Sequence, residues 1–145
     1  MLFPMLRRLD DGVEIFAEAG SAAVRLRSAE RPWDDEVLDL RCELADDGVS
    51  AVTWVRTLHG DGIVSWAADL AESYQGWDGV RGWESLENDL RIDATHDRRG
   101  HVSLRFVIRG PRGYDPGGRE ASVMVVLDAG EDMRRLVAEL GDLVS

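Results

Sequence analysis

Residues 76–108 read GWDGVRGWESLENDLRIDATHDRRGHVSLRFVI, and this stretch decides the fold class. Apolar and polar residues alternate on both sides of a turn at residues 97–100, which is typical of two antiparallel strands joined as a hairpin. Trp77 and Trp83 precede the hairpin in a loop that is rich in glycine. The stretch therefore predicts antiparallel β structure that is entered through an aromatic loop.

Similar alternating runs continue on both sides of this stretch. Short strands are predicted over residues 13–18, 24–28, 37–45, 49–58 and 121–127. A glycine- and proline-rich loop from Gly110 to Gly118 precedes the last strand. In the strand at 49–58, Val52, Trp54 and Leu58 share one face.

Two segments instead show helical spacing of their apolar residues. One runs from Ile63 to Tyr74, with Asp61 placed to cap its start and Gly76 to end it. The other spans Met133 to Leu140, with Gly141 as the expected C-cap. We therefore expect a single α+β domain over residues 1–145, with an antiparallel sheet of about six to seven strands and two helices on one face.

Composition and charge exclude several classes of function. The 145 residues include seventeen arginines, no lysine and a net charge of −11. An acidic chain is poorly suited to nucleic acid or to an anionic membrane surface, because both require a basic face. The charge fits a basic protein partner, which it would attract over distance, or it serves solubility alone.

The single cysteine excludes an intrachain disulfide, so an oxidising compartment is not needed. The apolar run at residues 1–6 is short and its arginines follow it, which fails the signal-peptide pattern, and no run is long enough to span a membrane. We expect a cytoplasmic protein. Cys42 lies in an alternating strand and is expected to be a buried, inert thiol rather than a nucleophile.

The tryptophan loop is the first candidate site, and it allows two interpretations. In the first, both rings, Trp77 and Trp83, are structural lids that fold back over the open end of the sheet. Alternatively they form an exposed recognition patch, because tryptophan and arginine dominate binding hot spots and Arg81 lies between them. In the second case, Asp78 and Glu84 supply charge to the binding site.

The histidines are the second candidate site. A turn over residues 97–100 would make His96 and His101 cross-strand neighbours. Their rings could then share a zinc ion, with Asp97 or Asp93 as an oxygen ligand. A solvated hairpin end is far commoner than such a site, so no metal is assigned.

No catalytic constellation accompanies these candidates. The sequence contains no nucleophile elbow and no phosphate-binding loop, and no pair of carboxylates lies in an apolar setting that would separate their pKa values. Nothing in the pattern calls for a cofactor. We therefore expect a protein that is not an enzyme.

The segment from Gly62 to Leu140 resembles a family of mainly actinobacterial proteins, domain of unknown function 6228. The resemblance is carried by the helix end at residues 70–74, the turn at 76–79, residues 83–86, the return at 100–102 and the strand at Glu120 before residues 129–131. The layout is also remotely similar to that of immunity proteins that accompany polymorphic toxins of the WapI type. This second resemblance implies a toxin-binding role and supplies no binding residues.

Three functions remain open from the sequence. The leading hypothesis is a non-enzymatic module that binds a protein, with a basic toxin as one such partner. The alternative is a small-ligand or metal-binding protein, or an enzyme, with His96 and His101 lining a site between sheet and helices. The third is an assembly module that pairs through an edge strand.

Overall fold

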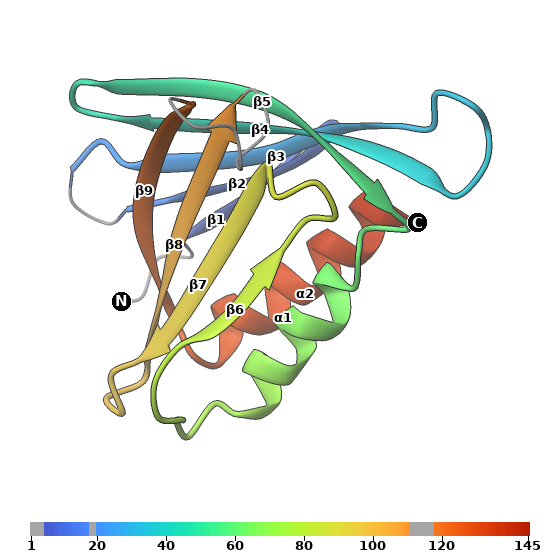
Figure 1. Cartoon of the computed structure of the whole chain (residues 1–145). Coiled ribbons are helices and arrows are strands. Elements are labelled where there is room, and N and C mark those ends of the chain that lie inside the picture. Colours follow the sequence, from blue (N-terminus) through green and yellow to red (C-terminus); the bar gives the residue numbers. More distant parts are fainter. Residues whose placement is uncertain (1–4, 18–19, 111–117) are drawn as a thin grey trace.

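The computed structural model describes residues 5–17, 20–110 and 118–145, which form two layers of strands and a pair of helices (Figure 1). The strands are β1 (Leu6–Leu9), β2 (Gly12–Phe16), β3 (Ala23–Glu30), β4 (Val37–Asp46), β5 (Val49–Leu58), β6 (Arg81–Glu84), β7 (Leu90–His96), β8 (His101–Gly110) and β9 (Arg119–Asp128). The helices are α1 (Ile63–Glu72) and α2 (Glu131–Val144). The strands within each sheet are antiparallel, so the predicted α+β class is confirmed.

The strands form two sheets, whereas one was predicted. Their orders are β1-β2-β3-β4-β5 and β6-β7-β8-β9. The chain leaves the first sheet after β5, and α1 carries it to β6, which pairs with β7 instead of β5. The strand count was too low because β1 and β6 have only four residues each, too few for a clear alternating pattern. Glu18, the predicted end of one strand, lies outside the described residues, as does most of the loop predicted between Gly110 and Gly118.

Both helices are where the spacing predicts them, but their ends differ. Gly62, in the left-handed conformation with φ 77°, is the N-cap of α1, so the prediction that Asp61 caps this helix is wrong. Gly141 does not end α2, which continues to Val144 and thereby buries Leu143. The extra turn is favourable because it adds an apolar side chain to the core. Neither helix is long and apolar enough to cross a membrane.

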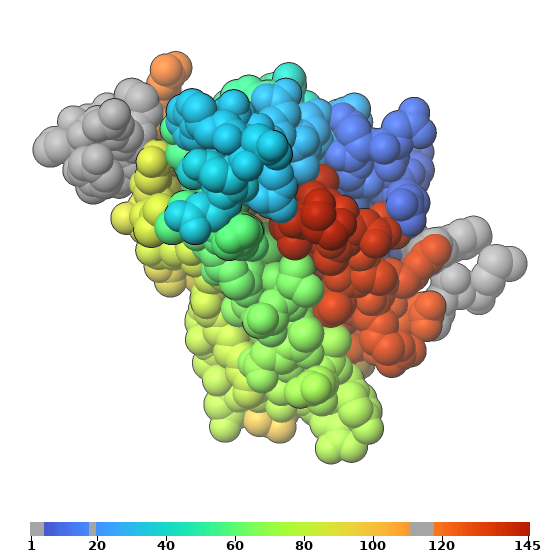
Figure 2. All heavy atoms as spheres, turned by 90° about the vertical axis from the view of Figure 1, so that its right-hand side faces the viewer, coloured from blue at the N-terminus to red at the C-terminus, as the bar shows by residue number. Residues whose placement is uncertain are grey.

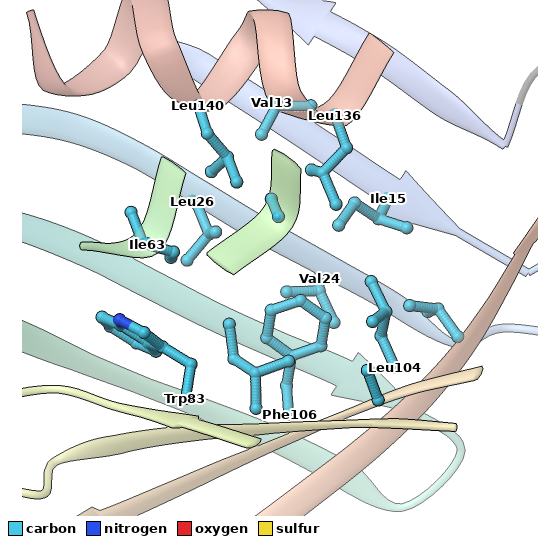
Figure 3. Packing of buried hydrophobic residues seen from close by; sticks show 14 of the residues in the cluster. Val13, Ile15, Val24, Leu26, Ile63, Trp83, Leu104, Phe106, Leu136 and Leu140 are labelled. Carbon is cyan, nitrogen blue, oxygen red and sulfur yellow. The ribbon is translucent and has the colours of Figure 1, made fainter. Parts of the chain in front are cut away.

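The core lies between the two sheets and the helix pair. The helices pack against each other, and α2 also contacts β1, β2 and β3 of the first sheet and β9 of the second. Figure 3 shows side chains from all these layers converging: Val13 and Ile15 from β2, Leu136 and Leu140 from α2, and Phe106 from β8. Truncating a large buried side chain in such a cluster costs about 3–5 kcal/mol of stability.

Candidate binding surface

The two tryptophans of the predicted patch are buried, with Trp77 5% and Trp83 7% exposed. Trp83 points from β6 into the core (Figure 3), and its indole N–H donates to the carbonyl oxygen of Asp61 at 2.9 Å. The Trp77 ring contacts the Arg81 guanidinium, 4.9 Å from its centroid, and the His96 ring, whose centroid is 5.2 Å away. Both rings therefore pack against the fold, as in the first interpretation, and do not form an exposed patch.

The charged side chains at residues 78–84, in β6 and the loop before it, are accessible, and they form ion pairs with neighbouring segments. Arg81 lies 3.1 Å from the Asp69 carboxylate on α1. Asp78 is bound by an arginine of the β7–β8 turn at 2.7 Å, and Glu84 pairs with an arginine of β7. A binding role for Asp78, Arg81 and Glu84 is not tested by this arrangement and stays a prediction.

The β7–β8 hairpin keeps the two histidines apart. His96 pairs with Val102, so the prediction that His96 and His101 are cross-strand neighbours is wrong by one residue. The Asp97 carboxylate sets this register, because it accepts the backbone N–H groups of Arg99 at 2.7 Å and His101 at 3.0 Å. The shift places the two histidines on opposite faces of the hairpin.

The histidine rings also have different partners. The Nε2 of His96 lies 2.8 Å from the Tyr74 carbonyl oxygen and must donate, while Nδ1 accepts the Arg98 N–H at 2.8 Å. In this arrangement Nε2 is the donor and Nδ1 the acceptor. The Nδ1 of His101 contacts the Asp97 carboxylate at 2.8 Å. Within the described ranges, no three His, Cys, Asp or Glu side chains lie close enough to hold a metal ion, so His96, His101 and Asp97 are not brought together as a ligand set.

Two hollows in the described part of the chain were candidates for a ligand site. A cavity of about 270 Å³ lies between the β1–β2 turn, β3 and α2, and its lining includes Asp10, Asp11, Glu139 and Asp142. Arg8 lies 3.2 Å from Asp142, so part of this charge is already compensated. A groove of about 650 Å³ lies between β5 and the ends of β8 and β9. Neither of these two hollows is lined by a histidine, so a ligand site that includes His96 and His101 stays a prediction.

Cys42 is fully buried, as predicted. Burial raises the pKa of its thiol to about 12, and the neighbouring Glu43 adds to the rise. A thiol with this pKa is protonated at neutral pH and does not act as a nucleophile.

Arginines on the outward face of the first sheet are neutralised within the molecule. Those with a carboxylate partner are Arg7, Arg25, Arg27, Arg41 and Arg56. The buried Glu14 carboxylate lies 2.6 Å from Arg25 and raises the pKa of that guanidinium. Glu43 similarly contacts three of these arginines. The face is therefore an ion-pair network rather than a row of free cations suited to phosphates.

Exposed apolar side chains gather instead around Trp33, which is 59% exposed in the β3–β4 loop. The guanidinium of Arg56, on β5, lies 4.6 Å from the centroid of the Trp33 ring and binds the Asp39 carboxylate at 2.9 and 3.0 Å. Trp54 and Leu58 flank Arg56 on the same outward face of β5, and both are exposed. We call the following residues the Trp33 surface: Trp33, Trp54, Arg56, Leu58 and Leu86.

Asp61 connects Leu86 to this surface. One carboxylate oxygen accepts the N–H of Leu58 at 2.9 Å, and the other accepts the N–H of Leu86 at 2.7 Å. The β6–β7 loop is thereby held beside the end of β5, and two exposed leucines from distant parts of the sequence become neighbours. The side chain that fails to cap α1 thus organises the candidate surface.

Carboxylates surround this apolar centre. Asp34, Asp35 and Glu36 follow Trp33 and are exposed, as is Glu87 after Leu86. Asp39, and from farther away Glu87, raise the pKa of Arg56. An apolar centre with a polar rim is the usual anatomy of a protein–protein interface.

The β3–β4 loop is anchored at its base. Arg31 donates to the carbonyl oxygen of Val144, at the end of α2, at 3.2 Å. Figure 2 shows this loop (cyan) protruding above α1 (green) and against the end of α2 (red). Trp33 is therefore displayed by a loop that contacts the body of the fold.

Sequence reasoning did not find the Trp33 surface. Its signals were present, since Trp33 stands in an acidic loop and Trp54 and Leu58 share one face of a strand. Leu86 and Glu87 lie in an acidic segment of the sequence, and nothing else there indicated a binding surface. Their place beside β5 depends on the Asp61 carboxylate, a contact between segments that periodicity does not show.

The comparisons with known proteins identify a family that has no assigned activity. A family model, described as a family of unknown function (DUF6228), matches residues 15–145. The match therefore extends beyond the segment from Gly62 to Leu140 into the first sheet. No curated protein matches the sequence significantly. The chain belongs to this family of unknown function.

Proposed function

We propose that this protein is a non-enzymatic module that binds another protein through the Trp33 surface. The observation that carries the proposal is the exposed Trp33 ring stacked on Arg56. Exposed Trp54 and Leu58 flank Arg56 on β5, and Asp61 holds exposed Leu86 beside Leu58. Tryptophan and arginine are the residue types most enriched in binding hot spots. Contiguous exposed apolar side chains in a folded chain commonly mark an interaction site.

The proposed partner is basic. The chain carries a net charge of −11, and exposed carboxylates at residues 34–36 and 87 border the apolar centre. Such a rim attracts a positive partner over distance and disfavours acidic competitors. The apolar centre would supply most of the affinity once the two surfaces meet.

A toxin neutralised by this chain is a partner of this kind, and we propose to test it first. The remote similarity of layout to immunity proteins is what suggests a toxin. Expression of the captured partner alone should then arrest growth, and co-expression of this chain should restore it. Normal growth with the partner alone would remove the immunity role and leave the binding role intact.

The experiment that tests the binding role is affinity capture from the cells that produce the protein. The tagged wild type is compared with Trp33→Ala and with Tyr74→Ala, which removes an equally exposed aromatic ring outside the Trp33 surface. We expect a stoichiometric basic partner with the wild type and Tyr74→Ala, and its loss with Trp33→Ala. Retention by Trp33→Ala, or no partner at all, would overturn the proposal.

The segment at residues 76–84, which ends in β6, is a second proposed contact. Asp78, Arg81 and Glu84 present charge there, although the two tryptophan rings are buried. Arg81→Ala in the same capture experiment tests it. Unchanged recovery of the partner would show that this segment does not contribute to binding.

A further inference from the structure

Strand β9 forms an edge of the second sheet, at the left in Figure 1. It pairs with β8 on one side, and no described strand pairs with its other side. The N–H of Ala129 donates to the Gly100 carbonyl oxygen at 2.8 Å, and this bond shows which residues of β9 direct their backbone groups toward β8. Odd-numbered residues of β9 therefore direct their N–H and C=O groups toward β8. Ser122, Met124 and Val126 direct theirs toward the free edge.

Among the described residues, the exposed edge of β9 has none of the usual protection. From Ala121 to Leu127 the strand contains no charge, proline or glycine, and its ten residues pair with β8 without a bulge. Met124 is 53% exposed, and Val126 beside it is also exposed. Folded proteins normally shield such an edge with charges, bulges or a covering segment, because a bare edge recruits another strand.

We propose that β9 pairs antiparallel with β9 of a second copy of this chain, symmetrically about Val123. Residues that lie opposite each other in an antiparallel pair project to the same face of the sheet. Odd-numbered residues of one copy must therefore lie opposite odd-numbered residues of the other, and even-numbered residues opposite even-numbered ones. Two registers allow this over nearly the full strand, one centred on Val123 and one on Met124. The second would place Glu120 opposite Asp128 twice, and like charges in that position are destabilising.

Charge also favours the register centred on Val123. Asp128 then lies opposite Gly118 of the second copy rather than opposite a carboxylate. Met124 then lies opposite Ser122 of the second copy, and Val126 opposite its Glu120. The two four-stranded sheets become one continuous sheet, and the exposed apolar side chains gain neighbours.

This assembly is independent of the proposed partner-binding role. Figure 1 places β9 at the opposite side of the molecule from the β3–β4 loop that carries Trp33. The dimer would therefore leave both Trp33 surfaces accessible. Failure of one proposal would not decide the other.

Disulfide trapping between single-cysteine additions tests the register. Opposed hydrogen-bonded residues have Cα atoms about 5.5 Å apart, within the range that a disulfide bridges. A mixture of Ser122→Cys and Met124→Cys should give a covalent dimer of twice 16.1 kDa on mild oxidation, while neither variant alone should. Cys42 is buried and does not interfere. No product from the mixture, or cross-linking of Met124→Cys alone, would overturn the proposed register.

Sedimentation over a wide range of protein concentration provides the second test. We expect the wild type to approach twice 16.1 kDa as concentration rises. Val126→Lys would face Glu120 of the other copy, and Val126→Glu would meet a like charge there. Because the contact occurs twice in the dimer, we expect the Kd for dimerisation to be about tenfold higher for Val126→Glu than for Val126→Lys. A wild type that stays monomeric, or equal behaviour of the two variants, would contradict the proposal.

Discussion

Trp83 and Trp33 show how differently one residue type is used in this fold. Trp83 lies in the core, and its N–H is satisfied by the Asp61 carbonyl oxygen. Trp33 lies in a loop between two strands, and its ring stacks on Arg56 but stays largely exposed. Both residues stand in polar, loop-like sequence. The difference comes from what lies across from each ring in space.

Asp61 belongs to both regions. Its backbone carbonyl accepts the N–H of buried Trp83, and its carboxylate holds the exposed Leu58 and Leu86 together. The core contact and the surface contact therefore share one residue, which adopts a left-handed backbone with φ 52°. Non-glycine residues in this region are uncommon, and aspartate and asparagine tolerate it best. The packing of Trp83 and the shape of the Trp33 surface are thus expected to be coupled.

Truncation of the buried ring should have the largest effect on stability. We expect Trp83→Ala to lower the free energy of unfolding by about 3–5 kcal/mol, because it opens a cavity and leaves the Asp61 carbonyl without its donor. Trp83→Phe keeps most of the volume and should lose clearly less. Urea denaturation measures both. A loss under about 1 kcal/mol for Trp83→Ala would mean that the ring is not part of the core.

Removal of the Asp61 carboxylate should have an intermediate effect. Asp61→Ala deletes both hydrogen bonds to Leu58 and Leu86 and places alanine in a left-handed conformation, so we expect a loss of about 1–3 kcal/mol. Asp61→Asn keeps one acceptor and tolerates the conformation. Asp69→Ala, an exposed aspartate of α1, is the control and should change stability by under about 0.5 kcal/mol. Equal losses for Asp61→Ala and Asp69→Ala would contradict the proposed linkage.

Acid should weaken the β7–β8 hairpin in a defined range of pH. Desolvation acts to raise the pKa of Asp97, but hydrogen bonds from the Arg99 and His101 N–H groups and from the His101 ring lower it to about 2, from an ordinary value of 3.8. A lowered pKa in the folded state stabilises the fold above the ordinary pKa, and that contribution is lost as pH falls from about 4 to about 2.

Thermal unfolding of wild type and Asp97→Asn across this range measures the effect. The wild type should be the more stable protein above about pH 4, and the difference should shrink as pH falls toward 2. A difference that does not change with pH would show that the Asp97 charge contributes nothing to the hairpin.

Truncation of the exposed ring should have the smallest effect on stability. We expect Trp33→Ala to change the free energy of unfolding by under about 0.5 kcal/mol, because most of the ring is already in contact with water. Denaturation beside Trp83→Ala gives the direct comparison. A loss of several kcal/mol for Trp33→Ala would make Trp33 a structural residue and remove the contrast between the two regions.

Much of the fold was predictable from sequence because its elements have clear periods. The alternation in β4, β5, β7, β8 and β9 and the helical spacing in α1 and α2 each reflect one buried face. The division into two sheets was not predictable, because the alternation of apolar and polar residues identifies a strand but does not show which strand it pairs with. β6 was missed because a four-residue strand with a glycine at its second position shows no alternation.

The candidate site was less predictable than the fold. The glycine-flanked rings of Trp77 and Trp83 looked available for binding, and the structure buries them under Arg81 and within the core. Trp33 was visible in the sequence, but the residues that complete its surface come from β5 and the β6–β7 loop. Only the tertiary contacts of Arg56 and Asp61 bring these segments together.

The most direct test of the central claim is the Kd of the captured partner for Trp33→Ala, compared with wild type, under conditions in which both proteins are fully folded. The account predicts a Kd at least about 30-fold weaker, the effect of losing a hot-spot side chain worth about 2 kcal/mol. An unchanged Kd would contradict it, because the exposed ring would then contribute nothing to recognition.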